Sequence, residues 1–444
     1  MRIRLAGINR EVGKEKIKGE IIPVAYARIS RSPLSIDEIR EKTKTDIEGA
    51  RKSAERIVFG YGHRSVAEHL VFNFDIEDIS RIAVEYIEKH RLISFTEKSQ
   101  RYVRLKKGFY IPSIADKSIK KLYIDAMEEL FNAYERGLKI SKDSEGILED
   151  YRYFLPLSTL TQLGMTINAR SLEYLIESEA SNKLDEIKTL ILELTKIGKH
   201  YAPSLIKYTQ PANIYDRIEK KINTGIVNQS EDDEDVRLIK VYGNEEDVVS
   251  SILFQKTSSY FNISKPQLSS ILETIFEHMD KHFLPPRAFE LVSYTFLITL
   301  SASAYAQLKR HRMMTVIRGE YNFNDYIVPE RLKHESSFFS KYVEKYGKLY
   351  KILKDLGLEE YMLLNAHRRK VLVHINAREM YHLASLRMDK HAQWEIRNIV
   401  RKMVGKIREH HPLLLLLATG KDDFDKRKNY VLRLLKSKKS LEVL

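Results

Sequence analysis

The sequence predicts an α+β fold made of two tandem copies of a mostly helical domain, each with a small antiparallel sheet. One observation is a repeated segment. Residues 72–91 (FNFDIEDISRIAVEYIEKHR) and 294–312 (YTFLITLSASAYAQLKRHR) each read as an aromatic strand, an amphipathic helix and a His–Arg step. Another is a repeated Asn-Ala-Arg step, which begins at Asn168 and again at Asn376. Two echoes in the same order, about half a chain apart, indicate a duplicated domain.

The length of the chain agrees with two domains. Its 444 residues are enough for two units that each bury a core of their own. An acidic run from Ser230 to Asp235 reads as an exposed linker. We therefore expect a first domain over 1–222, an acidic linker over 223–237 and a second domain over 238–444.

The spacing of apolar residues assigns the elements within each half. In the first half it predicts a strand and turn over 1–20, a helix over 35–59, a strand over 72–76 and mainly helices from 117 to 206. Between these, Ile79, Ile82, Ala83, Tyr86 and Ile87 fall on one face of a helix. In the second half it predicts helices over 265–282, 297–310, 376–387 and 390–409.

Composition narrows the class of protein. A hydrophobic content of 43% with 31% charged residues is typical of soluble globular proteins. No run approaches the roughly 20 apolar residues of a membrane span, and the N-terminal segment has no apolar signal core, so we expect a cytoplasmic protein. The chain has no cysteine, which excludes disulfides, thiolate metal ligands and a cysteine nucleophile. Abundant Lys, Glu, Ile and Tyr favour a thermophilic source.

The formal net charge of +14 has two interpretations. It suits an anionic partner such as a nucleotide or a nucleic acid, and it equally suits a lysine-rich surface. A basic tail from Lys426 to Lys439 carries much of the excess and reads as a solvated amphipathic helix. No zinc-finger spacing or aromatic-rich RNA-binding motif accompanies it, so a nucleic-acid partner is the less favoured interpretation.

The segment GHRSVAEH, residues 62–69, carries two signals. Ser65 and Glu68 have the spacing of a capping box at the start of a helix. A helix N-terminus with His63 beside it also suits a phosphate group. His63 and His69 are six positions apart, which does not place two ligands on one helix face, so we expect no metal site here.

Polar residues gather after the first amphipathic helix. Lys89, His90 and Arg91 end it, where cations relieve the helix dipole. In an extended chain Glu97, Ser99 and Arg101 lie on one face. A hydroxyl beside a guanidinium is a good pair for phosphate, so the segment is a candidate phosphate-binding site.

The region around the single tryptophan is the other polar concentration. Arg387, His391 and Glu395 are spaced by four, which predicts one helix face. Such a ladder is commonly only a surface feature, but its density favours a functional role. Asn168 and Asn376 can each be a helix N-cap.

Taken together, these motifs resemble the flavin-dependent thymidylate synthases. The family pattern Arg-His-Arg-x-x-Ser-x-Asn-Glu-x-Ser-x-Arg-Tyr is matched by residues 89–102, with Lys89 in place of Arg and Thr96 in place of Asn. The segment 62–69, the Arg152 to Pro156 step, both Asn-Ala-Arg steps and the segment 386–397 are further family landmarks. The similarity touches both halves of the chain.

The resemblance implies an activity and an assembly. Family members move a methylene group from methylenetetrahydrofolate to C5 of dUMP, with a hydride from reduced FAD and NADPH as the reductant. They are homotetramers of single domains with active sites at subunit interfaces, so a two-domain chain is expected to form a homodimer, a pseudo-tetramer of domains. The absence of cysteine agrees, because the other class of thymidylate synthase needs a thiolate nucleophile.

The resemblance also divides the expected dUMP contacts between the halves. The first half holds Glu97, Ser99, Gln100, Arg101 and Arg152, and the second holds Gln307, Arg310 and Arg387. The reciprocal positions are lost, with Tyr86, Lys89 and Glu179 in the first half and Arg318, Glu320 and Asn322 in the second. One hybrid site is therefore expected. In it Arg387 is the candidate catalytic residue, which stabilises charge developing on the uracil ring.

The FAD contacts implied by the resemblance fall in both halves. They are His63, Ser65, His90, Arg91 and Glu97 in the first, and Arg310, His311, Arg312, Asn376, Arg378 and His382 in the second. Tyr174 replaces the His382 equivalent in the first copy and Pro285 replaces the His63 equivalent in the second, which favours one flavin site over two.

Two alternatives stay open at this point. The Lys89 and Thr96 departures suit a non-catalytic flavin- or nucleotide-binding regulator. The +14 charge suits a flavin-dependent methyltransferase that acts on nucleic acid, which a steep salt dependence of RNA binding would indicate.

Overall fold

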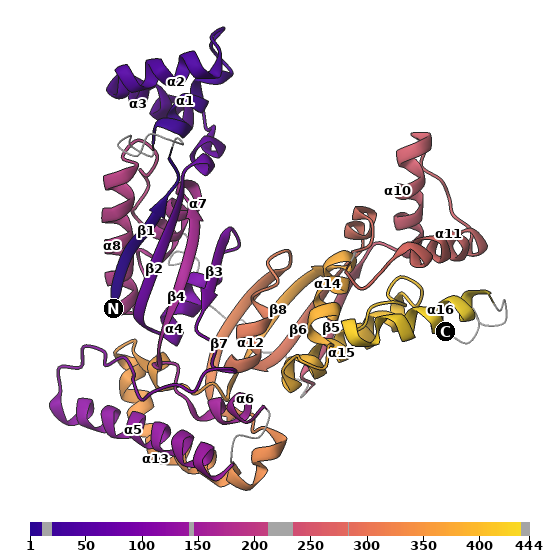
Figure 1. Ribbon diagram of the computed structural model, residues 1–444. Coiled ribbons are helices and arrows are strands. Elements are labelled where there is room, and N and C mark those ends of the chain that lie inside the picture. Colours follow the sequence, from indigo (N-terminus) through magenta and orange to yellow (C-terminus); the bar gives the residue numbers. More distant parts are fainter. Residues whose placement is uncertain (11–19, 142–145, 212–233, 283, 437–444) are drawn as a thin grey trace, which may run out of the picture. The chain divides into compact units, whose positions relative to one another are not determined.

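The computed structural model describes residues 1–10, 20–141, 146–211, 234–282 and 284–436, and the chain divides into two compact units (Figure 1). Unit 1 comprises Met1–Gln229 and Ser340–Leu364, and unit 2 comprises Ser230–Phe339 and Asn365–Leu444. Most of the expected acidic linker lies outside the described residues.

Unit 1 holds a four-stranded antiparallel sheet in the order β1-β2-β4-β3. From the first half of the chain it contains β1 (Arg2–Ile8), α1 (Ile21–Ile29), α2 (Ile36–Thr45), α3 (Ile47–Glu55), the π-helical turn η1 (Arg56–Gly60), the 3-10 helix η2 (Arg64–His69), β2 (Val71–Ser80), α4 (Arg81–Glu88), β3 (Ile93–Glu97), α5 (Lys117–Ile140), α6 (Ile147–Tyr151), the 3-10 helix η3 (Arg152–Phe154), β4 (Leu160–Asn168), α7 (Ala169–Glu179) and α8 (Asp185–Tyr201). From the second half it contains most of α13 (Ser336–Asp355) and the 3-10 helix η6 (Glu359–Met362).

Unit 2 repeats this sheet with the order β5-β6-β8-β7, again antiparallel throughout. Its elements are β5 (Val236–Tyr242), α10 (Glu245–Thr257), α11 (Lys265–His278), η4 (Arg287–Leu291), β6 (Ser293–Ser301), α12 (Ala302–Leu308), β7 (Thr315–Tyr326), η5 (Glu330–Glu335), β8 (His367–Asn376), α14 (Ala377–Arg387), α15 (Trp394–His410), η7 (Lys421–Asp423) and α16 (Phe424–Lys436). The predicted α+β class, with a small antiparallel sheet in each part, is confirmed.

Each sheet packs one face against helices. In β2 the alternating residues Phe72, Phe74 and Ile76 are fully buried, as expected when side chains point to opposite faces with a period of two. In unit 2, Tyr294 and Phe296 of β6 belong to a core cluster that also contains residues of α14 and α15. The helix after the last central strand is thereby fixed against the sheet in both units.

The same capping contact starts the first sheet-covering helix of each unit. Ser80 caps α4 and donates from Oγ to Glu186 at 2.5 Å, and Ser301 caps α12 and donates to Glu395 at 2.5 Å. Both carboxylates also accept the backbone N–H of their serine. The helix predicted over 297–310 was therefore wrong at its start, because 293–301 is strand and the buried Ser301–Glu395 pair sets the first turn.

Other predicted helix bounds also change. The helix expected over 35–59 is two helices, because Asp46 leaves helical geometry and caps α3 by accepting from Gly49 N at 2.9 Å. The helix expected over 265–282 is α11, which ends four residues earlier, at His278. The helix expected over 390–409 is α15, which begins four residues later, at Trp394. Among the described residues, no helix is long and apolar enough to cross a membrane.

Segment 340–364 comes from the second half of the chain but belongs to unit 1. Tyr346 and Lys345 of α13 bond to Glu129 of α5 at 2.7 and 2.6 Å. Farther along, Leu157 N donates to Leu363 O at 2.6 Å. Long helix α13 follows β7 as α5 follows β3, so the equivalent long helices of the two halves pack together in one unit.

Candidate functional site

In unit 1 the end of α4 meets the end of α7. His90 Nε2 lies 3.4 Å from Oε1 of Glu179, and Lys89 Nζ lies 2.6 Å from the same oxygen. Burial alone would raise the pKa of Glu179, but the hydrogen bond from His90 and the charge of Lys89 lower it to about 2. The residue of the first copy that is equivalent to Arg387 is therefore an ionised glutamate, Glu179, which is paired with residues of its own unit.

This glutamate predicts an acid-sensitive contribution to stability. Because its folded pKa is lowered from 4.5 to about 2, the contribution is present above the unfolded value and is lost as pH falls from about 4.5 to about 2. At neutral pH it amounts to about 3 kcal/mol. Glu179→Gln is expected to lower the free energy of urea unfolding at pH 7 and much less at pH 3. The exposed Glu193→Gln is the control, and equal pH profiles for the two variants would contradict the assignment.

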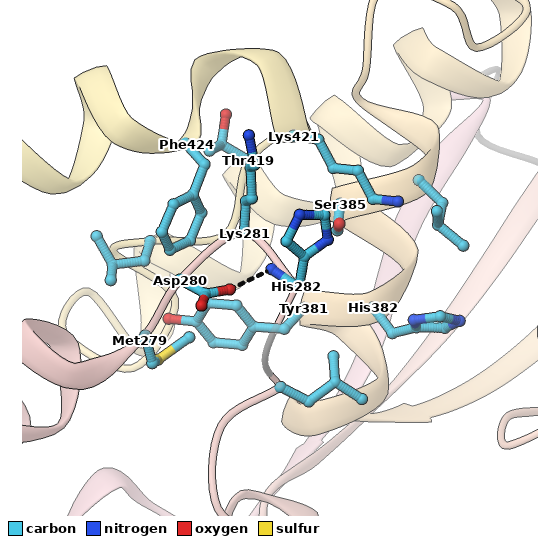
Figure 2. A pocket seen from close by; sticks show the side chains of 13 residues that line it. Met279, Asp280, Lys281, His282, Tyr381, His382, Ser385, Thr419, Lys421 and Phe424 are labelled. Carbon is cyan, nitrogen blue, oxygen red and sulfur yellow. Dashed lines mark hydrogen bonds between the residues drawn. The ribbon is translucent and has the colours of Figure 1, made fainter.

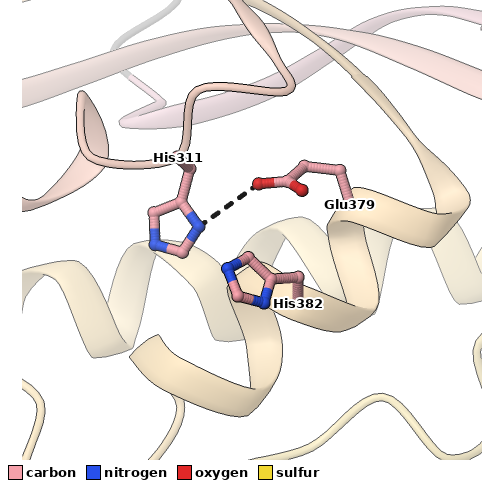
Figure 3. A group of neighbouring side chains, drawn as sticks. All are labelled: His311, Glu379 and His382. Carbon is pink, nitrogen blue, oxygen red and sulfur yellow. Dashed lines mark ion pairs between the residues drawn. The ribbon is translucent and has the colours of Figure 1, made fainter. Parts of the chain in front are cut away.

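In unit 2 the equivalent position is an arginine with a different neighbourhood. Arg387 Nε donates to His311 Nε2 at 3.0 Å, and the other ring nitrogen of His311, Nδ1, lies 3.4 Å from Glu379 Oε1 (Figure 3). The ring of His382, one turn after Glu379, lies 5.3 Å from that of His311 between centroids. Burial, then the charge of Arg387, lowers the pKa of His311 to about 3, so this imidazole is neutral at neutral pH.

The predicted common strand face of Glu97, Ser99 and Arg101 is wrong. Strand β3 ends at Glu97, whose carboxylate accepts from Arg81 at 2.9 Å. The chain then turns, with Val103 N bonded to Ser99 O at 3.2 Å and Arg101 N bonded to Ser99 Oγ at 3.1 Å. The serine hydroxyl competes for the backbone and favours the turn over continued strand.

The turn nevertheless brings two expected substrate-binding arginines together. Arg101 forms an ion pair with the carboxylate of Glu149, and Arg152 Nε donates to the backbone oxygen of Glu149 at 3.2 Å. Arg152 is buried, and this burial lowers its pKa. Glu97 and Ser99 line a pocket of about 340 Å³ on the same unit. The neighbouring Gln100 is buried.

Helix α12 carries the substrate-binding candidates of unit 2. Gln307 is buried, and within the part of the chain that the structure describes neither its Nε2 nor its Oε1 has a hydrogen-bond partner. Arg310 follows at the end of the helix and is half-buried, and Arg312 is exposed. A buried amide without partners costs folding free energy, which favours a role in binding a polar ligand.

The predicted capping box at residues 62–69 is wrong. The segment is a 3-10 helix whose N-cap is His63, and no side chain bonds the cap position. Glu68 forms an ion pair instead with Arg170 of α7 at 2.5 Å. The 3-10 helix has its N-cap at His63, two residues earlier than the box requires. Ser65 and His63 are exposed, and the His63 ring lies 3.5 Å from Arg31.

Both predicted asparagine caps are confirmed. Asn168 accepts from Ser171 N and Asn376 accepts from Glu379 N, each at 2.8 Å. Arg378, the arginine of the second Asn-Ala-Arg step, donates from Nε to Pro285 O at 2.9 Å. Ser171 and Glu379 therefore occupy the same position of equivalent helices.

The predicted helix face Arg387, His391 and Glu395 is wrong. Helix α14 ends at Arg387, and His391 lies in the turn that follows, where its backbone N–H bonds to Asp389 at 3.0 Å. Glu395 points into the core as the partner of Ser301. An acidic side chain that bonds the backbone two residues later is a common turn former, and it interrupts the ladder.

A pocket of about 260 Å³ lies against the C-terminal half of α14 in unit 2 (Figure 2). Its lining includes the basic side chains Lys281, His282 and Lys421 beside His382, with Asp280 as the acidic member. Such a lining suits an anionic group.

Each expected flavin contact has a defined environment within its own unit. His63, Ser65, Arg91 and Arg312 are exposed, His90 and His311 are buried, and Glu97, Arg310, Asn376, Arg378 and His382 are half-buried. Three residues that contact the substrate or flavin candidates were not found from the sequence, and they are Arg81, Glu149 and Glu379. Only Glu379 had a usable signal, because it departs from the Ser171 of the first copy.

Comparison with known proteins assigns the family. The family described as thymidylate synthase complementing protein matches this chain twice, over residues 15–204 and 237–413. These regions cover most of the chain. The first contains β2, β3 and β4, and the second contains β6, β7, β8 and all but the first residue of β5. The chain therefore belongs to this family and contains two of its domains in tandem.

Individual relatives fall into two groups. A UPF0159 protein of Thermoplasma acidophilum is 26% identical over 87% of this chain and 92% of its own length. A flavin-dependent thymidylate synthase of Clostridium tetani is 28% identical over 48% of this chain and 90% of its own length. One from Saccharolobus solfataricus is 33% identical over 44% of this chain and 73% of its own length. A solved UMP/dUMP methylase from Streptomyces cacaoi aligns with a TM-score of 0.39 at 20% identity, over 46% of this chain and 92% of its own.

Proposed function

We propose that this protein is a flavin-dependent thymidylate synthase that makes dTMP from dUMP and methylenetetrahydrofolate. FAD would supply the hydride after reduction by NADPH. Its membership of the family and the relatives that carry this name support the proposal. We also propose a homodimer, which gives four family domains in all.

The difference between Arg387 and Glu179 is the observation that carries the proposal. These residues end equivalent helices, but the first copy holds a glutamate already paired with Lys89 and His90, whereas the second holds an arginine on a neutral histidine. A guanidinium can stabilise negative charge that develops on a uracil ring, and a carboxylate cannot. The catalytic arginine is thus proposed to come from the second half alone.

The other proposed dUMP contacts come from both halves of the chain and together form one site. Ser99, Arg101 and Arg152 of the first half would bind the phosphate and sugar, because clustered guanidinium and hydroxyl donors match phosphate oxygens. Glu97 and Gln100 would orient the nucleotide beside them. Gln307 and Arg310 of the second half would bind it together with Arg387. The loss of the reciprocal residues in each half supports one site per chain rather than two.

The chemistry of the donor set fits FAD. A pyrophosphate needs cationic and N–H donors, and the proposed contacts supply His63, Ser65, His90 and Arg91 from the first half, with Arg310, His311, Arg312, Asn376, Arg378 and His382 from the second. The basic pocket that includes His382 is consistent with an anionic occupant. His311, held neutral by burial, is proposed to hold a fixed proton rather than a charge beside the flavin.

The buried side-chain amide of Gln307 allows a test of the dUMP contacts proposed for the second half. Gln307→Leu is expected to leave the melting temperature unchanged or higher, because no internal hydrogen bond is lost. It is expected to weaken dUMP binding by about fivefold, since a ligand hydrogen bond is worth about 1 kcal/mol. Calorimetric titration and thermal unfolding of the same sample check both effects. A lower melting temperature with unchanged dUMP affinity would assign Gln307 to the core instead.

The proposed function itself is tested by turnover and stoichiometry. FAD-loaded protein is titrated with dUMP, and tritium release from 5-³H-dUMP is followed with methylenetetrahydrofolate and NADPH. One dUMP per chain with turnover is the expected result. One dUMP without turnover would favour a flavin- or nucleotide-binding regulator. No dUMP binding, with salt-sensitive binding of RNA, would favour a methyltransferase of nucleic acid.

A further inference from the structure

Three ionisable side chains and one arginine of unit 2 form a connected buried group. His311 is 3% exposed and Glu379 is 6% exposed, and His311 contacts both Glu379 and the half-buried Arg387. Ligand-type atoms of His311, Glu379 and His382 all lie within 4.8 Å of one another. The family resemblance gives Glu379 no role, and the first copy has Ser171 in its place.

The hydrogen bond from Arg387 fixes the proton on His311. Arg387 Nε always carries hydrogen, so His311 Nε2 must accept, and a neutral ring then carries its proton on Nδ1. That proton faces Oε1 of Glu379 at 3.4 Å. Burial raises the pKa of Glu379, and its Oε1 is the oxygen that faces this proton as an acceptor.

From this geometry we propose that Glu379 and His311 are positioning residues that hold the Arg387 guanidinium in its working orientation. The inference rests on the proposed function, in which Arg387 is the catalytic arginine. An arginine side chain loses rotamer entropy when it is held in one orientation, and fixing it before the substrate arrives removes that cost from the reaction. The carboxylate orients the ring, and the ring orients the guanidinium.

The internal repeat supports this assignment. Helices α7 and α14 have equal lengths and asparagine caps of the same geometry, so the two copies can be compared position by position. Where the last residue is Arg387, the helix carries Glu379, and where it is Glu179, the helix carries Ser171. The carboxylate is present only in the copy that has an arginine to orient.

The same cluster could instead suggest a metal ion, but the arginine argues against it. A metal bound at His311 Nδ1 would put the ring proton on Nε2, where it would face the N–H of Arg387. The positive charge of Arg387, which contacts the same ring, opposes a cation as well. Zinc binding is therefore an outcome that would overturn the proposal.

Activity measurements test the positioning role. Glu379→Ser, which copies the first half, is expected to lower kcat by up to about 100-fold with little change in the KM for dUMP. Glu379→Gln keeps an acceptor of equal length and is expected to recover most of kcat. Ser171→Ala, at the same position of the other copy, is the matched control with unchanged kcat. Unchanged kcat in Glu379→Ser, or an equal loss in the glutamine variant, would overturn the proposal.

Ring-nitrogen NMR tests the proton position without any need for turnover. In ¹⁵N-histidine protein, with His311→Gln used for assignment, His311 is expected as a neutral ring protonated on Nδ1 at pH 7. In Glu379→Ser the ring is expected to lose its fixed orientation and with it the hydrogen bond from Arg387, so both neutral tautomers become populated. A charged ring, a proton on Nε2, or stoichiometric Zn²⁺ binding that Glu379→Ser abolishes would each overturn the proposal. A protein with the expected NMR result but no dTMP formation would refute the proposed function and leave the arrangement of Glu379, His311 and Arg387 in place.

Discussion

Arg387→Ala is expected to lower kcat for dTMP formation by about 10²- to 10³-fold, the usual cost of removing one preorganised donor from developing charge. The guanidinium is half-buried at the end of α14, where its Nε donates to His311 Nε2 at 3.0 Å, and thermal unfolding of the variant checks that the fold is kept. Arg387→Lys keeps the charge but not the planar fork and should recover only part of the rate. Tritium release from 5-³H-dUMP at saturating substrate gives kcat for the unchanged protein and for both variants.

The repeat supplies the control for this experiment. Glu179→Gln changes the equivalent residue of the first copy and is expected to keep its turnover at neutral pH, although it lowers stability. The exposed Arg433→Ala on α16 controls for the loss of one positive charge. An Arg387→Ala enzyme with more than about a tenth of normal kcat would remove Arg387 from the chemistry.

The duplicated fold was predictable because its signals are local and repeated. The echo of 72–91 in 294–312 became two sheets of the same topology, and both asparagine caps were readable from residue type and position. The start of α12 was not readable, because the apolar run before Ser301 fits a buried strand and a buried helix equally well. Only Glu395, ninety-four residues later in the chain, decides between them.

Side-chain partnerships that cross long sequence distances were also beyond the sequence. Periodicity predicts that α13 has an apolar face, but it does not say that this helix packs with α5 of the other half. In the same way, spacing placed Arg387 and His391 on one helix, whereas Asp389 turns the chain between them. The candidate site residues were identified by resemblance, and the contacts that hold them needed the structure.

Arg101→Ala is expected to lower kcat/KM for dUMP by about 100-fold, since charge-assisted bonds to phosphate contribute about 3 kcal/mol. The residue follows the turn after β3 and pairs with Glu149, so the loss falls mainly on KM rather than on the fold. Arg318→Ala changes the position in the second half that corresponds to the lost Glu-x-Ser-x-Arg motif, and its kcat/KM is expected to stay within about twofold of normal. Equal losses in both variants would contradict a single hybrid site.

Mixing the two inactive variants separates the possible origins of the hybrid site. Arg101→Ala lacks a dUMP contact from the first half, and Arg387→Ala lacks the catalytic arginine from the second half. If each site draws both shares from one chain, a mixed and re-equilibrated sample contains no intact site and stays inactive. If the shares come from different chains of a homodimer, each mixed dimer contains one intact site, and about a quarter of normal activity returns at random pairing. No recovery would place both sets of residues of one site in a single chain, and recovery would place the site between two copies of the chain.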